Sequence, residues 1–270
     1  MSSCKTQLNR SAGPPRPPIL EHHANSIPSR RICADRTRHT GGSCDLDGDT
    51  SVTGHPTIRV GASVELEARW DIPESPERGV VLCHPHPLHR GTMHVPLFDA
   101  VAEALLPRQV AVLRFNFRGV GRSTGSHDGG LAEIDDVAAA MDYANTTFPE
   151  IEFGVAGWSF GATAALRWHA RDRAQQNYVG IAPGISASGG QPLPEPERLL
   201  PVPRTIIVGD RDQLVPVDAV VDYAERADAT LHILKGSDHF FYFREQKVAC
   251  LLAAGLGVPV PAEEIRLACE

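Results

Sequence analysis

The stretch Gly157-Trp158-Ser159-Phe160-Gly161 holds the residue types that could most directly do chemistry. An apolar run over 151–157 leads into it and an alanine-rich run follows, which predicts a strand, a sharp turn and a helix with Ser159 at the apex. The flanking glycines leave room for strand and helix to approach closely. Such a turn lifts the hydroxyl above the free N–H groups of a helix N-terminus, which favour developing negative charge. We therefore predict a nucleophilic serine, against the alternative of a glycine-rich turn with a solvent-facing hydroxyl.

A serine hydroxyl is a weak nucleophile near neutral pH and needs a general base, which in turn needs an acid to orient it. In open α/β sheets the reactive residues lie in loops beyond the carboxyl ends of the strands. Asp212 follows one late strand of the sequence and His239 follows the next. The predicted catalytic residues are therefore Ser159, Asp212 and His239, in that chain order.

Two other carboxylates compete with Asp212 for the role of the acid. Asp210 stands directly after Gly209 and is more typical of a residue that supports the turn. Asp238 is the sequence neighbour of His239, and adjacent residues cannot easily point into one ring geometry. Asp212 lies farther into its loop and is preferred.

The elements that must position these residues alternate between strand and helix from residue 55 onward. Short, continuously apolar strands are typical of a mostly parallel sheet that helices cover on both faces, so the predicted fold class is α/β in one domain. The expected strands are 58–60, 64–70, 80–83, 110–115, 151–157, 178–182, 204–208 and 230–234, and the expected helices are 96–106, 131–145, 160–170, 218–226 and 246–254.

Residues 1–54 differ in composition from the rest of the chain. They are rich in Ser, Arg, Thr, Gly and Pro and show no apolar period of a helix or a strand. Too little apolar surface is available to offset the ordering entropy, so we expect a disordered tail over 1–54 and a folded domain over 55–270. An organelle-targeting leader is a less favoured interpretation, because the segment contains acids and lacks a clear amphipathic helix.

Composition and charge exclude several classes of function. A net charge of −7 argues against nucleic acid and anionic lipid as partners. The sequence has no run of about 18 apolar residues, so no membrane span is expected. The six cysteines are scattered without CxxC pairs, which favours free thiols in a reducing compartment and hence a cytoplasmic protein.

Five ordered blocks give the chain a family resemblance. They are His84-Pro85-His86-Pro87-Leu88, residues 114–121 (RFNFRGVG), residues 157–161 (GWSFG), residues 209–212 (GDRD) and residues 238–241 (DHFF). Over residues 56–255 the chain resembles the α/β-hydrolase superfamily, and within it a compact bacterial-type group of uncharacterised hydrolases. The resemblance implies a nucleophile at Ser159, an acid at Asp212 and a base at His239.

The resemblance also implies an oxyanion hole made of two backbone N–H groups. One comes from Phe160, the residue after the nucleophile, and the other from the loop that follows the strand 80–83. In that loop Pro85 and Pro87 have no N–H to donate, so the backbone of His86 is the expected second donor.

Two further clusters have alternative interpretations. Histidines 84, 86, 89 and 94 could be imidazole ligands of zinc, but no thiolate or carboxylate pattern accompanies them, so loop architecture is favoured and no metal is expected. Residues 118–125 are glycine-rich but lack the Gly-Lys-Ser/Thr ending of a phosphate loop, and form a tight turn instead. Arg118 and Arg122 in that turn could meet an anionic substrate or form structural salt bridges.

Only the segment 183–203 separates two late strands at the place where many enzymes of this fold insert a cap, and it is too short to build one. A shallow, open pocket for a small acyl compound is expected. The predicted activity is hydrolysis of a carboxylic ester or thioester through an acyl-enzyme, without a cofactor. A peptidase or amidase, or a non-catalytic binding protein on the same fold, are the alternatives; the sequence indicates no oligomeric state.

Overall fold

The structure is a computed structural model that describes residues 52–185 and 191–269. Of the tail predicted over residues 1–54, positions 1–51 lie outside the described residues. Within the described ranges, no helix combines the length and the apolar character that a membrane crossing requires.

The described strands form one sheet in the order β1-β3-β5-β4-β6-β7-β8-β9, and β2 pairs with a second stretch of β3. Neighbours from β5 through β9 run parallel, whereas β1, β2 and β5 are antiparallel to β3. The predicted α/β class with a mostly parallel sheet is thereby confirmed. The strands are β1 (Val52–Gly54), β2 (Thr57–Val60), β3 (Val64–Ile72), β4 (Arg78–Cys83), β5 (Val110–Phe115), β6 (Glu152–Trp158), β7 (Tyr178–Ile181), β8 (Arg204–Gly209) and β9 (Thr230–Leu234).

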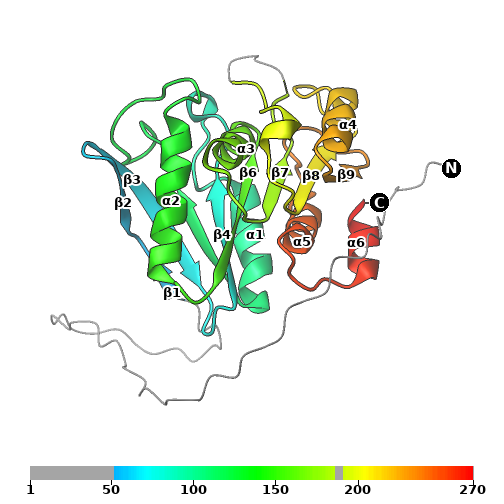
Figure 1. Ribbon diagram of the computed structural model, residues 1–270. Helices are drawn as coiled ribbons and strands as arrows, with labels where there is room; N and C mark the ends of the chain where they lie inside the picture. The colour runs from blue at the N-terminus through cyan, green and yellow to red at the C-terminus, as the bar shows by residue number, and fades with distance from the viewer. Residues whose placement is uncertain (1–51, 186–190, 270) are drawn as a thin grey trace, which may run out of the picture. The chain divides into compact units, whose positions relative to one another are not determined.

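Helices cover both faces of the sheet (Figure 1). Apolar side chains of α2, α3 and α4 share one core cluster with the sheet, and those of α1, α5 and α6 share the other. The helices are α1 (Pro96–Leu105), α2 (Glu133–Thr147), α3 (Phe160–Asp172), α4 (Val217–Arg226), α5 (Glu245–Gly255) and α6 (Ala262–Cys269).

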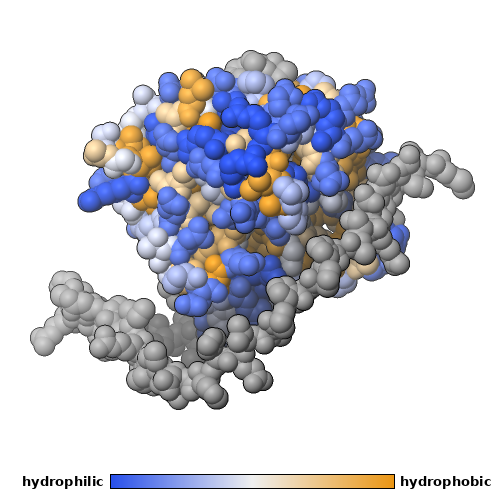
Figure 2. Space-filling view, in the orientation of Figure 1, coloured by the Kyte–Doolittle hydropathy of each residue, from blue (hydrophilic) through white to orange (hydrophobic). Residues whose placement is uncertain are grey.

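The central strands contain continuous apolar runs because each of their faces meets a layer of helices. In β4, Val81 and Cys83 belong to the cluster with α2 and α3, whereas Val80 and Leu82 belong to the cluster with α1 and α5. Side chains alternate along a strand, so two buried faces require an unbroken apolar run. On the face that Figure 2 shows, by contrast, hydrophobic residues form separate patches among hydrophilic ones.

Two elements were not expected from the sequence. Val52–Gly54 pairs with β3, so the sheet begins three residues inside the range assigned to the tail. Helix α6 follows α5 and packs its Ala268 and Cys269 into the core on that side. The segment between β7 and β8 contains, in its described part, only a short 3₁₀ turn, Pro196–Arg198. The fold therefore has no cap in the described residues.

Candidate active site

Ser159 lies at the turn between β6 and α3 in a backbone conformation that few residues adopt. Its φ of 53° and ψ of −114° are in a strained region for a non-glycine residue. The neighbouring glycines are sterically required: a Cβ at Gly157 would lie 2.4 Å from the Gly161 carbonyl carbon, and one at Gly161 would lie 2.0 Å from the Cys83 oxygen. This close approach holds the serine at the carboxyl edge of the sheet, half-buried.

The imidazole of His239 lies between a hydroxyl and a carboxylate. Its Nε2 is 3.0 Å from Ser159 Oγ, and its Nδ1 is 2.8 Å from Asp212 Oδ2. Trp158 Nε1 donates a hydrogen bond of 3.2 Å to the His239 carbonyl, which anchors the histidine loop to the end of β6. The structure thus brings together the three residues that the sequence placed after three different strands.

The Asp212 side chain is fully buried and held by backbone donors. Its Oδ1 accepts hydrogen bonds from the N–H groups of Leu214 and Val215, at 2.9 and 2.8 Å, which leaves Oδ2 for the histidine. A buried carboxylate that is satisfied in this way stays oriented.

The two competing acids have other partners. Asp210 Oδ1 accepts a hydrogen bond of 2.6 Å from the Gly236 N–H, and so supports the turn after β9. Asp238 Oδ1 accepts from the N–H groups of Phe240 and Phe241 within its own loop. Of the three aspartates, Asp212 is the one whose carboxylate contacts the His239 ring.

Gly209 lets the acid loop and the histidine loop meet. A Cβ at this position would lie 2.2 Å from the Ser237 carbonyl oxygen. The same oxygen accepts a hydrogen bond of 2.9 Å from the Arg211 N–H. The end of β8 and the loop after β9 therefore fit together only with a glycine here.

The two expected oxyanion donors lie on the other side of Ser159. Phe160 opens α3, and the first N–H groups of a helix have no partner within it. His86 precedes a 3₁₀ turn, Pro87–His89, and its carbonyl accepts hydrogen bonds from His89 and Gly91. The rings of His86 and Phe160 are 5.1 Å apart, so the two residues are neighbours, and their role as donors stays a prediction.

His84 holds this loop in place. Its Nε2 accepts a hydrogen bond of 3.0 Å from the Phe117 N–H, and its Nδ1 lies 2.6 Å from the Pro85 carbonyl oxygen. Burial lowers the pKa of His84 to about 4, so the ring is neutral at physiological pH. Both ring nitrogens are engaged, and within the described residues no three His, Cys, Asp or Glu side chains are grouped as metal ligands.

The arginines of the glycine-rich turn are paired with carboxylates of the same chain. Arg118 Nη2 lies 2.5 Å from Oδ1 of the buried Asp136, and Arg122 Nε lies 2.9 Å from Glu67 Oε1. Of the two interpretations of these arginines, the geometry favours structural salt bridges.

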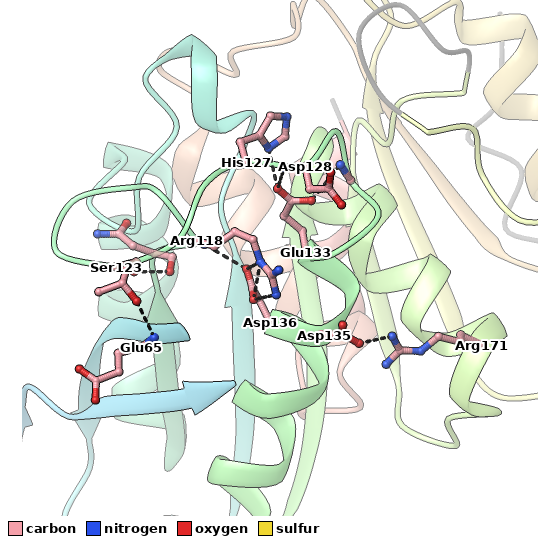
Figure 3. A network of polar contacts seen from close by, with 12 residues as sticks. Glu65, Arg118, Ser123, His127, Asp128, Glu133, Asp135, Asp136 and Arg171 are labelled. Carbon is pink, nitrogen blue, oxygen red and sulfur yellow. Dashed lines mark hydrogen bonds and ion pairs between the residues drawn. The ribbon is translucent and has the colours of Figure 1, made fainter. Parts of the chain in front are cut away.

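One pair near the site has no counterpart in the sequence analysis. His127 Nδ1 lies 2.7 Å from Oε1 of Glu133, whose side chain is fully buried (Figure 3). The His127 ring is 5.1 Å from that of His86 and 5.4 Å from that of Phe160. A His six positions before a Glu that opens a helix is not a recognised motif, because the pairing depends on how the intervening loop folds.

A cleft of about 350 Å³ opens at the opposite edge of the sheet, beside the amino ends of β4 and β6. Arg78, Glu152 and Asn177 contribute to its lining. Since the serine, aspartate and histidine all follow the carboxyl ends of strands, this cleft is remote from them.

Comparison with known proteins shows the family. Residues 75–200 match the protein-family model described as serine aminopeptidase, S33. The uncharacterized protein RP471 of Rickettsia prowazekii is 31% identical over an alignment of 202 positions, which covers 69% of this chain and 82% of that protein. The crystal structure of XC6422 from Xanthomonas campestris, described as an α/β serine hydrolase without a lid, superposes with a TM-score of 0.65. It is 30% identical and covers 77% of this chain and 96% of its own.

The chain belongs to the lid-less serine hydrolases of the α/β-hydrolase superfamily. The structure of the esterase Pf2001 from Pyrococcus furiosus, at 22% identity and a TM-score of 0.66 over 77% of this chain and 91% of that one, shares the fold. The resemblance that the five sequence blocks predicted is confirmed at the level of the superfamily and of this group.

Proposed function

We propose that this α/β hydrolase cleaves a small carboxylic ester or thioester through an acyl-enzyme. The observation that carries the proposal is the position of the His239 ring, 3.0 Å from Ser159 Oγ on one side and 2.8 Å from Asp212 Oδ2 on the other. A nucleophile, a base and an orienting acid within hydrogen-bond distance are the requirements for acyl transfer by a serine.

The reaction has two halves. His239 Nε2 takes the proton of the Ser159 hydroxyl as Oγ attacks the acyl carbon, and the backbone N–H groups of Phe160 and His86 stabilise the resulting oxyanion. The imidazolium then gives its proton to the leaving alcohol or thiol, and the acyl group stays on Ser159. In the second half His239 takes a proton from water as the water oxygen attacks the acyl carbon. The bond between that carbon and Ser159 Oγ then breaks, His239 returns the proton to Oγ, and the acid leaves. Asp212 keeps the Nδ1 proton in place throughout.

The surroundings of the site support a small substrate. The segment between β7 and β8 contributes no cap in its described part. Beyond the base, Phe240 and Tyr242 stack with ring centres 5.7 Å apart, and both are exposed. Such a rim offers an apolar surface to part of a small ester.

The test is the variant Ser159→Ala, assayed with p-nitrophenyl acetate and butyrate. Turnover should fall by a factor on the order of 10⁴ to 10⁶, because the serine acts as one unit with its base. Unfolding free energy should change by less than about 1 kcal/mol, because removing one hydroxyl from a half-buried turn leaves no core cavity. A fluorophosphonate probe should label wild type at Ser159 and leave the variant unlabelled. Wild-type turnover in the variant would favour a binding protein on this fold.

The description of the matching family model, serine aminopeptidase, favours amide hydrolysis as a second candidate. Short peptide p-nitroanilides distinguish the two, since the same residues would act on an amide. Hydrolysis of the esters without hydrolysis of the p-nitroanilides would support the proposed esterase activity. Faster turnover of a p-nitroanilide than of the esters would favour a peptidase instead.

A further inference from the structure

The contact between His127 and Glu133 repeats part of the geometry of the proposed catalytic site. The Glu133 carboxylate accepts hydrogen bonds from the N–H groups of Asp128 and Gly130, at 2.8 and 2.9 Å. Its Oε1 also lies 2.7 Å from His127 Nδ1, approaching off the axis of the N–H bond, so this third contact is electrostatic rather than a well-aligned hydrogen bond. A buried carboxylate with three contacts fixes the orientation of the ring.

The remaining nitrogen of His127 is turned away from Glu133. Figure 3 shows Nδ1 facing Glu133 and the second ring nitrogen pointing away from it and from α2. Nδ1 is completely covered, yet 11% of the side chain is exposed, so the exposed part belongs to the other atoms of the side chain. The ring therefore has one held end and one end that a small molecule can reach.

The loop that carries His127 lies against the residue after the nucleophile. A Cβ at Gly130, whose φ is 87°, would lie 3.3 Å from Phe160 Cε2. The rings of His127, His86 and Phe160 are within 5.1 to 5.4 Å of one another. His127 is thus a neighbour of both residues whose backbones we propose as oxyanion donors.

The side of the substrate that meets His127 follows from the proton transfer. His239 must protonate the leaving oxygen or sulfur, so the leaving group lies on the His239 side of the acyl carbon. The ring neighbours of His239 are Trp158 and Phe240, a set distinct from the neighbours of Phe160. The group beside His127 is therefore the acyl part.

We propose that His127 is a specificity-determining residue whose second ring nitrogen hydrogen-bonds a hydroxyl group on the acyl chain, which makes a short hydroxyacyl ester or thioester the preferred substrate class. A hydroxyl both donates and accepts a hydrogen bond, and so fits the imidazole whether that nitrogen carries a proton or a lone pair. The inference rests on the proposed ester hydrolysis at Ser159 and adds the substrate class to it.

The experiment compares two nearly isosteric esters, p-nitrophenyl 3-hydroxybutyrate and p-nitrophenyl 3-methylbutyrate, which differ in a hydroxyl against a methyl group. The measure is the ratio of their kcat/KM values in wild type divided by the same ratio in His127→Phe, which cancels the intrinsic reactivity of the esters. Phe keeps an aromatic ring against His86 and Phe160. We expect the preference for 3-hydroxybutyrate over 3-methylbutyrate to be about tenfold smaller in the variant than in wild type, which corresponds to about 1.4 kcal/mol. The kcat/KM for 3-methylbutyrate should stay within about threefold of its wild-type value.

Two further variants complete the test. His127→Gln can still hydrogen-bond and should retain part of the preference, and it replaces His127→Phe if that variant does not fold. His55→Phe makes the same substitution at an exposed residue of the loop between β1 and β2 and should leave the ratio unchanged.

Each other outcome overturns the inference. Hydrolysis of 3-methylbutyrate with an unchanged ratio in both His127 variants would refute the role of His127 and leave the proposed function standing. Equal losses of kcat/KM on both esters in the His127 variants would mean that His127 has a structural role. Hydrolysis of neither ester by wild type, together with no fluorophosphonate labelling of Ser159, would refute the proposed function itself.

Discussion

Two imidazole–carboxylate pairs lie near Phe160, and part of their geometry is alike. His239 Nδ1 lies 2.8 Å from Asp212, and His127 Nδ1 lies 2.7 Å from Glu133. Both carboxylate side chains are fully buried, and each accepts hydrogen bonds from two backbone N–H groups of its own loop. The pairs come from different strand ends and from opposite orders in the chain, since the acid precedes the histidine in one and follows it in the other.

The pairs differ in what meets the second ring nitrogen. For His239 it is the Ser159 hydroxyl at 3.0 Å, whereas the second nitrogen of His127 points away from its carboxylate, and we propose that it meets a hydroxyl group of the substrate. An oriented imidazole is therefore not in itself a catalytic group. The strained turn after β6, which places a hydroxyl opposite one ring, makes the difference between a proposed base and a proposed binding residue.

The largest expected effect tests this difference by combining variants. His239→Ala should reduce turnover of p-nitrophenyl butyrate by a factor on the order of 10⁴ to 10⁶, and the double variant with Ser159→Ala should be hardly slower than either single one. His127→Ala combined with Ser159→Ala should likewise add no further loss, whereas alone it should cost less than about tenfold on this ester, which has no acyl hydroxyl to bind. Steady-state kinetics on wild type and these five variants provides the test. A loss of 10⁴ from His127→Ala alone would make the two pairs equivalent.

The second prediction concerns the acids. Asp212→Asn should lower kcat by about 10⁴ by favouring the wrong tautomer of His239, and Glu133→Gln should cost less than tenfold on p-nitrophenyl butyrate. Glu133→Gln should instead reduce the free energy of unfolding by about 2 kcal/mol, because it weakens charge-assisted hydrogen bonds in a buried site. Kinetics and urea unfolding measure the two effects. Asp210→Asn is the matched control, and a greater loss of kcat there than in Asp212→Asn would contradict the assignment.

The smallest expected effect concerns an imidazole that is buried without a carboxylate. His169 Nε2 has no hydrogen-bond partner in the described structure, and burial, together with the charge of Arg204, lowers the pKa of His169 to about 4. The unfolded chain, with a histidine pKa near 6.5, then binds a proton first as pH falls. The associated stability is complete above about pH 6.5 and is lost between about 6.5 and 4.

His169→Phe should remove this loss, because Phe keeps the ring between Trp168 and Tyr178 without a titrating group. Between pH 7.5 and 4.5 the variant should lose about 2 to 3 kcal/mol less unfolding free energy than wild type, as measured by urea denaturation at both values. Parallel losses in the two proteins would show that His169 is not buried in its neutral form.

The sequence predicted the parallel part of the fold because buried parallel strands contain continuous apolar runs, as in Val80–Cys83 of β4 and Val110–Leu113 of β5. It did not predict β1, since three residues carry no period and Val52–Gly54 is recognisable as a strand only beside its partner in β3. Helix α6 was missed because only its last two residues, Ala268 and Cys269, are buried.

The residues of the candidate site also divide into those that the sequence could predict and those that it could not. Ser159, Asp212 and His239 could be predicted because each follows a strand whose position the apolar pattern determines. The contact of His127 with Glu133 could not be predicted, because it depends on the turns at Gly129 and Gly130, both with positive φ, and on the burial of a carboxylate that composition alone would place at the surface.

The short connection between β7 and β8 has a kinetic consequence. Where a lid closes over a substrate, its opening and closing are additional steps in every turnover and can limit kcat. In the described part of this chain no domain covers Ser159, so substrate and product exchange with water without a domain motion. In the proposed mechanism, turnover is then set by acyl transfer or by departure of the acid, and solvent viscosity acts only through diffusion of the substrate.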